Sequence, residues 1–330
     1  APFAPEAANA GQMITFQALL LGAWLVLNGA PAPARATARA LAAGIVIAAA
    51  AIVVDTALGH GPAARYATLI GETFSPSAFN RALTILVLLT FVQLGAVTLP
   101  RALRLASMGA VAAAVFLGEG AAAMAALALG ALAAALTARL GVRVTGVLAV
   151  LAAMVILGMP FMVRNVPVDD DAFMARFPPG NAQARLHIWD YTAGRALERP
   201  LLGWGPDAGQ YFSELPKIDR PLVRDGEAIP WVARPIPSHP HNGPLQLWLE
   251  YGLVGVLFAV ALVAVAFAQA RRLVAPGPAL ASGLVIAALT VTSTAYGLWQ
   301  MNWPCAMAIA ALLGTACSRR DPAREALNKS

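Results

Sequence analysis

The chain has 330 residues, of which 59% are hydrophobic and only 12% are charged, and its mean hydropathy is +0.67. A soluble domain carries about a quarter of charged residues, so this composition excludes an ordinary soluble protein and predicts an all-α polytopic membrane protein. The net charge of +6 would suggest nucleic-acid binding in a soluble chain. The arrangement of the basic residues instead assigns the charge to membrane topology, and nucleic-acid binding has no support.

Apolar segments of membrane-spanning length recur along the chain and predict about nine transmembrane helices. Residues 1–12 lack a basic n-region and do not resemble a signal peptide, which leaves room for further helices upstream. Residues 110–138 are rich in alanine and glycine, a composition that suits close helix packing in lipid. The predicted helices cover residues 13–29, 38–58, 81–99, 102–118, 120–140, 143–163, 244–270, 278–298 and 301–318.

Basic residues fall in every second connection and in the C-terminal tail, which is the positive-inside pattern. They are Arg35, Arg39, Arg101, Arg104, Arg139, Arg143, Arg271, Arg272, Arg319, Arg320, Arg324 and Lys329. The pattern predicts a bundle of six helices over 1–163, an external segment over 164–243, further helices over 244–318 and a cytoplasmic tail over 319–330. In a bacterial inner membrane the external side is the periplasm, which contains no ATP or nucleotide sugar. Synthetic chemistry there needs a donor that is already activated and carried in the membrane.

The external segment 164–243 is the only large polar part of the chain, and loops of this length are usually functional. Residues 182–198 have helical spacing and predict an amphipathic helix at the membrane interface. One face carries Leu186, Trp189 and Ala193, and other sides carry Arg185, His187, Asp190 and Arg195. Trp189 and Trp204 are expected to be interfacial anchors. Arginines on such a helix would face lipid phosphates even without catalysis.

His241 and Asn242 stand where this polar segment joins the next apolar helix. Pro237, Pro240 and Pro244 keep the adjoining backbone extended, so the imidazole is expected in a cleft at the mouth of the helix. Its pKa would then be close enough to neutrality for proton transfer. The alternative is that Asn242 simply caps the helix.

Three aspartates, residues 169–171, raise the question of a metal site, since hard cations bind carboxylates. A solvated start of the loop explains them better, and we predict no metal and no cofactor.

Three sequence blocks together resemble the O-antigen ligase family, which also contains bacterial polysaccharide polymerases and O-linked protein glycosyltransferases. They are Arg185-Leu-His-Ile-Trp189, then Glu198-Arg-Pro-Leu-Leu-Gly-Trp-Gly-Pro206, then His241-Asn242 with nine residues before Gly252 and Gly255. The resemblance covers about residues 80–318. It implies transfer of a glycan from undecaprenyl pyrophosphate to a lipid or glycan acceptor at the periplasmic face, without nucleotide or metal.

One position departs from the family's pattern. Members commonly carry a Ser-Arg-Gly-like triplet whose arginine helps to hold the donor pyrophosphate, but here the equivalent triplet is Gly118-Glu119-Gly120. A carboxylate cannot bind pyrophosphate in this way, so either another arginine substitutes or this member works differently. The candidates are Arg164, Arg81 and Arg65. Glu119 could instead hydrogen-bond to an acceptor sugar.

These residues define a hypothesis for an inverting glycosyl transfer. Arg185 would stabilise the departing diphosphate, and His241 would remove the proton of the acceptor hydroxyl. Asn242 and Gln246 would orient the sugar or the imidazole, and the remaining candidates for substrate binding are Arg164, Glu119, Arg81 and Trp189, with Tyr211 or Trp231 stacking on sugar faces. A polymerase or protein glycosyltransferase of the same family is the first alternative. A transporter of lipid-linked glycans is the alternative from another class, although the sequence shows no internal repeat.

Overall fold

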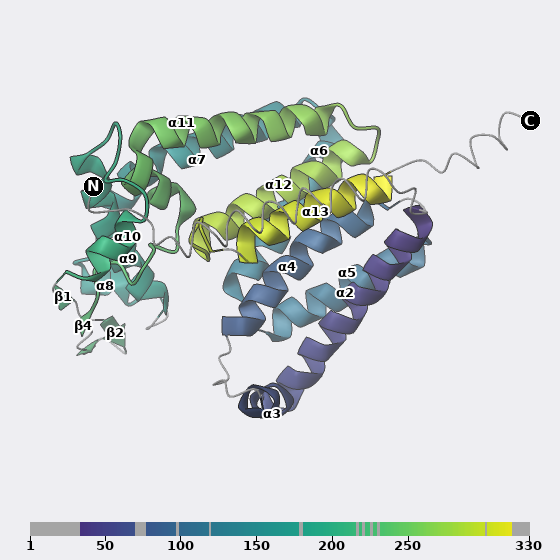
Figure 1. The fold of residues 1–330 in the computed structure, drawn as a ribbon, viewed down its shortest axis with the longest axis horizontal. Coiled ribbons are helices and arrows are strands. Elements are labelled where there is room, and N and C mark those ends of the chain that lie inside the picture. Colours follow the sequence, from purple (N-terminus) through teal and green to yellow (C-terminus); the bar gives the residue numbers. More distant parts are fainter. Residues whose placement is uncertain are drawn as a thin grey trace, which may run out of the picture. The chain divides into compact units, whose positions relative to one another are not determined.

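The computed structural model describes residues 34–69, 77–96, 99–118, 120–177, 181–215, 218–219, 222–224, 227–229, 232–300 and 302–318. These residues are mainly helical (Figure 1), which confirms the all-α fold. The helices are α2 (Ala34–Ala57), α3 (Gly61–Leu69), α4 (Ser77–Leu94), α5 (Arg101–Leu117), α6 (Ala121–Leu140), α7 (Val144–Arg164), α8 (Asp171–Met174), α9 (Asn181–Glu198), α10 (Ala208–Ser213), α11 (Gly243–Arg271), α12 (Gly277–Thr294) and α13 (Asn302–Ser318). Two short antiparallel pairs join β1 (Ile218–Asp219) to β4 (Val232–Ala233) and β2 (Leu222–Arg224) to β3 (Glu227–Ile229).

Among the described residues, five helices are long and apolar enough to cross a membrane, namely α2, α6, α7, α11 and α12. Helices α4 and α13 are apolar but shorter over the residues that the structure describes. The chain is therefore a multi-pass membrane protein. The predicted helix over 13–29 lies outside the described residues, and the total of nine spans stays a prediction.

Three helices differ from their predicted bounds by four or more residues at an end. The helix predicted over 38–58 begins at Ala34. The helix predicted over 81–99 runs from Ser77 to Leu94, and the helix predicted over 278–298 ends at Thr294. The carbonyl groups at the end of α12 have hydrogen-bond partners outside the helix. The carbonyl oxygens of Thr294 and Ala295 accept hydrogen bonds from side chains instead of from a further helical turn. The short helix α3 was not predicted; the Asp55 carboxylate accepts a hydrogen bond from the Ala63 amide at its start.

The chain divides into two compact units. Unit 1 contains the described residues of 147–266 and 292–300, and unit 2 contains those of 34–146, 267–291 and 302–318. In unit 2, helices α2, α4, α5 and α13 pack against one another (Figure 1). The predicted close packing of small residues is found where α6 meets α12. A Cβ atom on Gly130 would lie 2.8 Å from the Gly283 carbonyl oxygen and 2.7 Å from the Phe91 ring.

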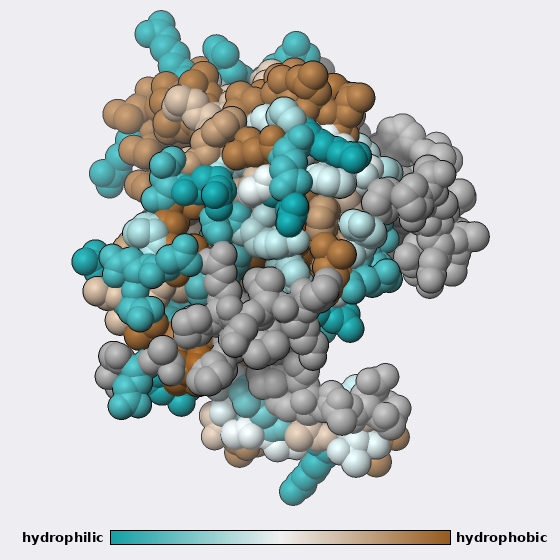
Figure 2. Space-filling view, turned by 90° about the vertical axis from the view of Figure 1, so that its left-hand side faces the viewer, coloured by the Kyte–Doolittle hydropathy of each residue, from teal (hydrophilic) through white to brown (hydrophobic). Residues whose placement is uncertain are grey.

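Unit 1 contains the polar segment, and helix α9 lies in its interior. The predicted helix is confirmed, and its location at the membrane interface stays a prediction. The helix buries polar residues as well as the expected apolar face. His187 is 3% exposed and Asp190 is 6% exposed. Gln183, with no exposed surface, donates to the Val223 carbonyl and accepts from the Val223 amide, which fixes β2 against the start of α9. Figure 2 shows the face of the molecule that carries this segment, with hydrophilic side chains over much of its described surface.

Helix α11 is interrupted at Gly252, whose backbone has φ 58° and ψ −152°. The segment Pro200–Gly205 lies across this interruption and supplies the missing hydrogen bonds. The Leu253 amide donates to the Pro200 carbonyl, and the Trp204 amide donates to the Leu249 carbonyl. A Cβ atom on Gly252 would lie 2.5 Å from the Leu201 carbonyl carbon, and a Cβ on Gly203 would lie 2.5 Å from that of Glu250. The two glycine-containing blocks of the sequence therefore form one structural unit.

Candidate active site

Arg185 and His241 converge on the short segment that follows α12. The Arg185 guanidinium donates from Nη1 to the carbonyl oxygen of Thr294. The His241 ring nitrogen Nδ1 lies 3.1 Å from the carbonyl oxygen of the next residue, Ala295. All of these residues belong to unit 1. The arrangement holds a cation and an imidazole on consecutive carbonyl groups although they are far apart in the sequence.

The hydrogen bond to Ala295 defines the tautomer of His241. A carbonyl oxygen can only accept, so Nδ1 carries the proton and a neutral ring presents its lone pair at Nε2. Burial lowers the pKa of His241, the Ala295 hydrogen bond opposes this, and the positive charge of Arg185 lowers the pKa further. The neutral form, which can accept a proton, is therefore favoured near pH 7. Burial also lowers the pKa of Arg185.

A second histidine, His239, supports the backbone of the first. Its Nδ1 accepts a hydrogen bond of 3.2 Å from the His241 amide, and the two rings lie 4.2 Å apart. Burial, with smaller contributions from His241 and Arg185, lowers the pKa of His239 to about 4. His241 has a positive φ of 53°, which costs a non-glycine residue about 1–2 kcal/mol, and the bond to His239 helps to hold it. The sequence analysis gave His239 no role; the His-Pro-His spacing was the available signal.

The motif residues after His241 serve α11. Asn242 Oδ1 accepts from the Leu245 amide at 3.1 Å, so the expected helix cap is present. Within the described residues, Asn242 Nδ2 is buried and has no hydrogen-bond partner. Gln246 is 3% exposed. Its side-chain oxygen accepts a hydrogen bond from the Leu298 amide, and its NH₂ group donates one to the Glu250 carboxylate. Their predicted contacts with substrate stay predictions.

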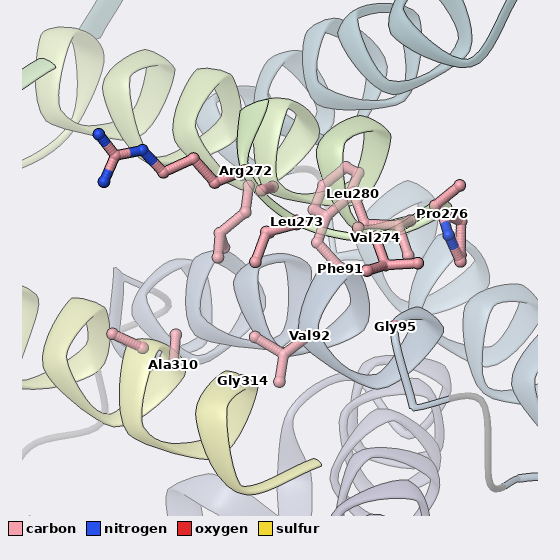
Figure 3. A pocket seen from close by; sticks show the side chains of 15 residues that line it. Phe91, Val92, Gly95, Arg272, Leu273, Val274, Pro276, Leu280, Ala310 and Gly314 are labelled. Carbon is pink, nitrogen blue, oxygen red and sulfur yellow. The ribbon is translucent and has the colours of Figure 1, made fainter. Parts of the chain in front are cut away.

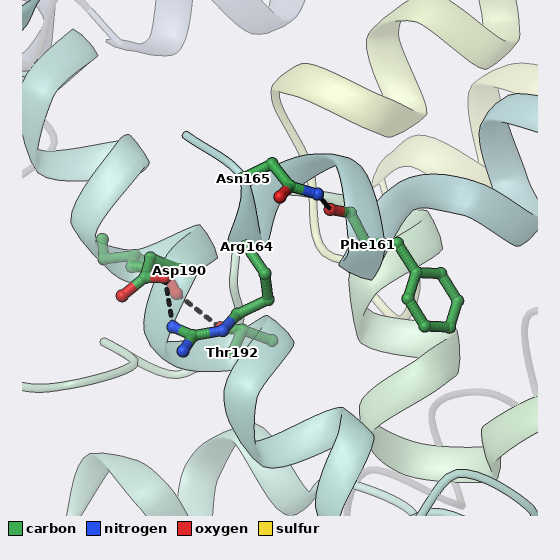
Figure 4. Close-up of polar contacts among 6 residues, drawn as sticks. Phe161, Arg164, Asn165, Asp190 and Thr192 are labelled. Atoms are coloured by element: carbon green, nitrogen blue, oxygen red, sulfur yellow. Dashed lines mark hydrogen bonds and ion pairs between the residues drawn. The ribbon is translucent and has the colours of Figure 1, made fainter. Parts of the chain in front are cut away.

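Trp189 on α9 and Arg164 on α7 each form a side-chain contact within unit 1. The Trp189 indole N–H donates to the Pro240 carbonyl at 2.8 Å, immediately before His241. Arg164 forms an ion pair with the buried carboxylate of Asp190 (Figure 4). Arg164 keeps half of its side chain exposed. Both residues are therefore positioned by protein contacts, and a role in binding substrate stays a prediction.

A contribution of the other predicted residues to this group stays a prediction. Arg81 belongs to unit 2, where its exposed side chain lies near the start of α4. Glu119 and Trp231 lie outside the described residues. Asp170 accepts hydrogen bonds from the Ala172 and Phe173 amides and caps α8.

A cavity of about 630 Å³ lies in unit 2 (Figure 3). None of the residues that line it is a candidate site residue. Apolar side chains of α4, α12 and α13 form most of its lining, and the guanidinium of Arg272 points away from it in Figure 3. This cavity contains no candidate acid, base or nucleophile, so we assign the candidate active site to unit 1.

Fold and site together describe a multi-pass α-helical membrane protein with an arginine–histidine centre in its polar segment. Residues 105–260 match the model of the O-antigen ligase family. The resemblance inferred from the motifs is thereby confirmed.

The chain is also similar to curated proteins named "Putative polysaccharide ligase". It is 28% identical over 147 residues to one from Rickettsia conorii and 26% identical over 147 residues to one from Rickettsia felis, covering 44% of this chain and 34% of each relative. It is 33% identical over 96 residues to one from Rickettsia bellii, covering 28% of this chain and 21% of the relative. The matches thus span about a third or less of these relatives' length. No solved structure matches the chain significantly.

Proposed function

We propose that this chain transfers a glycan from undecaprenyl pyrophosphate to an acceptor at the periplasmic face of a bacterial inner membrane. The family match and the polysaccharide ligase relatives support an O-antigen ligase-like reaction. Lipid A–core is the acceptor that we propose. The observation that carries the proposal is the convergence of Arg185 and His241 on consecutive carbonyl groups.

In this reaction the acceptor hydroxyl attacks the anomeric carbon of the donor sugar. Its proton passes to Nε2 of His241, the nitrogen that the Ala295 hydrogen bond leaves unprotonated. The bond between the anomeric carbon and the phosphate oxygen breaks, and undecaprenyl pyrophosphate leaves with the electron pair. A single displacement inverts the anomeric configuration.

Arg185 stabilises the charge that develops on the leaving diphosphate. The hydrogen bond to Thr294 orients the guanidinium, whose other N–H groups suit phosphate oxygens. The partly buried setting strengthens this electrostatic effect relative to water. The same cation favours the neutral form of His241, so one residue assists both the leaving group and the base.

Reconstitution in liposomes tests the proposal. Protein, an undecaprenyl pyrophosphate-linked polysaccharide and lipid A–core should yield glycan-modified lipid A–core with inverted anomeric configuration. A deletion strain should accumulate lipid-linked polymer. Accumulation of single repeat units would instead identify a polymerase, and absence of transfer to any glycan, lipid or protein acceptor would refute the proposal.

A further inference from the structure

Residues 294–300 determine how the two catalytic candidates are placed. This segment supplies the Thr294 carbonyl to Arg185 and the Ala295 carbonyl to His241. Gln300 Nε2 also lies 2.8 Å from His239 Nε2. Any displacement of the segment would therefore shift the cation and the base together.

Two residues one turn apart on α11 hold this segment in place. The Leu298 amide donates to Gln246 Oε1 at 2.8 Å, and Gln246 Nε2 donates to Glu250 Oε1 at 2.8 Å. The Trp299 indole N–H donates to Glu250 Oε2 at 2.6 Å. Glu250 is 1% exposed, so the carboxylate is buried beside the segment that it contacts.

The chemistry of these groups makes the direction of each hydrogen bond unambiguous. A backbone amide and an indole N–H can only donate. Gln246 must therefore direct its oxygen to Leu298 and its NH₂ group to Glu250. Glu250 must accept on both carboxylate oxygens, and the main chain of Asp207 is a further hydrogen-bond partner of this carboxylate. A side chain with one oxygen and one NH₂ group cannot satisfy the same neighbours.

We propose that Glu250 is a positioning residue for glycan transfer. Together with Gln246 it forms a hydrogen-bonded relay that fixes residues 294–300 and thereby orients Arg185 and His241. Glu250 itself touches neither candidate through the contacts described, so it acts through the segment. This inference rests on the proposed function for its catalytic consequence, while the relay itself has a separate structural readout.

An exchange of the two side chains tests the relay. Glu250→Gln places an NH₂ group against a donor and should break at least one bond. In the double variant Gln246→Glu/Glu250→Gln, the carboxylate at 246 accepts from the Leu298 amide and from the new amide at 250. The new amide oxygen then accepts from the Trp299 indole, so the relay is restored with its donors and acceptors rearranged. Glu198→Gln removes the exposed carboxylate paired with Arg195 and serves as the matched control.

Two measurements on the full chain in liposomes decide the outcome. Hydrogen–deuterium exchange over residues 292–300 should accelerate about tenfold or more in Glu250→Gln, because a buried hydrogen bond is lost. With the lipid-linked donor, kcat should fall by at least about tenfold with a smaller change in KM, because orientation rather than binding is lost. The double variant should recover slow exchange and most of kcat, and Glu198→Gln should match the wild type in both.

Other results would overturn the proposal. Unchanged exchange in Glu250→Gln would show that the carboxylate does not hold the segment. A double variant as impaired as Glu250→Gln would show that the carboxylate is needed at position 250 itself, as for a residue that contacts substrate. Faster exchange with undiminished kcat would remove the positioning role. If the wild-type protein transfers no glycan, the proposed function fails, and the exchange data alone decide whether the relay exists.

Discussion

Arg185 and His241 hydrogen-bond to the carbonyl oxygens of two consecutive residues, Thr294 and Ala295. The segment that follows α12 therefore positions both side chains, although they come from different parts of the chain. A cation and a proton acceptor held in this way can act on opposite sides of one anomeric carbon, provided that their orientation is kept.

Replacing His241 with alanine should reduce kcat by about a hundredfold to ten-thousandfold, the usual contribution of a general base. The half-buried ring contacts His239 and the Ala295 carbonyl, so thermal stability should fall modestly while membrane insertion should not change. Transfer of glycan from a lipid-linked donor measures the first effect and a thermal melt in detergent measures the second. His60→Ala, in unit 2, is the control; near-normal turnover by His241→Ala would end the general-base assignment.

Replacing Arg185 with lysine should lower kcat by about a hundredfold, comparable to the removal of one well-placed oxyanion donor. An ammonium group cannot both bond to Thr294 and present a planar fork to a diphosphate. Arg195→Lys on the same helix, where the arginine stacks on Tyr191 and pairs with Glu198, should leave turnover unchanged. Equal losses in both variants would point to a general effect on α9.

The pH dependence of kcat/KM should show an acid limb centred below pH 6.5. The pKa of His241 is lowered by burial and by Arg185, so the proton-accepting form persists as the pH falls below the ordinary histidine value. Activity is therefore present above this limb and lost as the pH falls through the pKa of the folded protein. Arg185→Gln removes a nearby positive charge and should move the limb upward. A limb above pH 6.5 in the wild type would contradict the assignment.

Replacing Gly252 with alanine should destabilise the protein by about 1–3 kcal/mol, because the position needs a positive φ and has no room for Cβ. Gly194→Ala offers a matched control, since a Cβ there meets nothing within 4 Å in helix α9. That substitution should be neutral or should stabilise by up to about 1 kcal/mol. Thermal melts in one detergent compare the two variants, and equal melting temperatures would argue against the close approach of Leu201.

The ion pair of Arg164 and Asp190 offers a test of what Arg164 does. Arg164→Gln should destabilise by about 1–2 kcal/mol, less than a fully buried pair because half of the arginine side chain is exposed. Adding Asp190→Asn should recover most of the stability. If the double variant also transfers glycan normally, the pair is structural. A stable double variant with a raised donor KM would instead support the predicted contact of Arg164 with substrate.

Hydropathy is a local signal, and it allowed most of the described helices to be predicted. The choice of Arg185 and His241 came from the motif resemblance, and their catalytic roles stay predictions. The supporting residues could not be predicted in the same way. Glu250 and His239 gain their roles only from contacts with residues 294–300, which the apolar pattern extended into helix α12. The burial of His187 and Asp190 likewise depends on how the polar segment folds around α9. Periodicity within one helix carries no information on such distant partners.

The segment Pro200–Gly205 completes the hydrogen bonding of α11 at Gly252, and this sets a rule for making chimeras within the family. A graft that replaces the polar segment from Arg199 onward would remove the chain that α11 requires and leave its interrupted backbone unsatisfied. Exchange of residues 214–234 alone would keep both blocks from one parent. Residues 214–234 could then be exchanged between relatives without rebuilding the helix that carries His241 at its entrance.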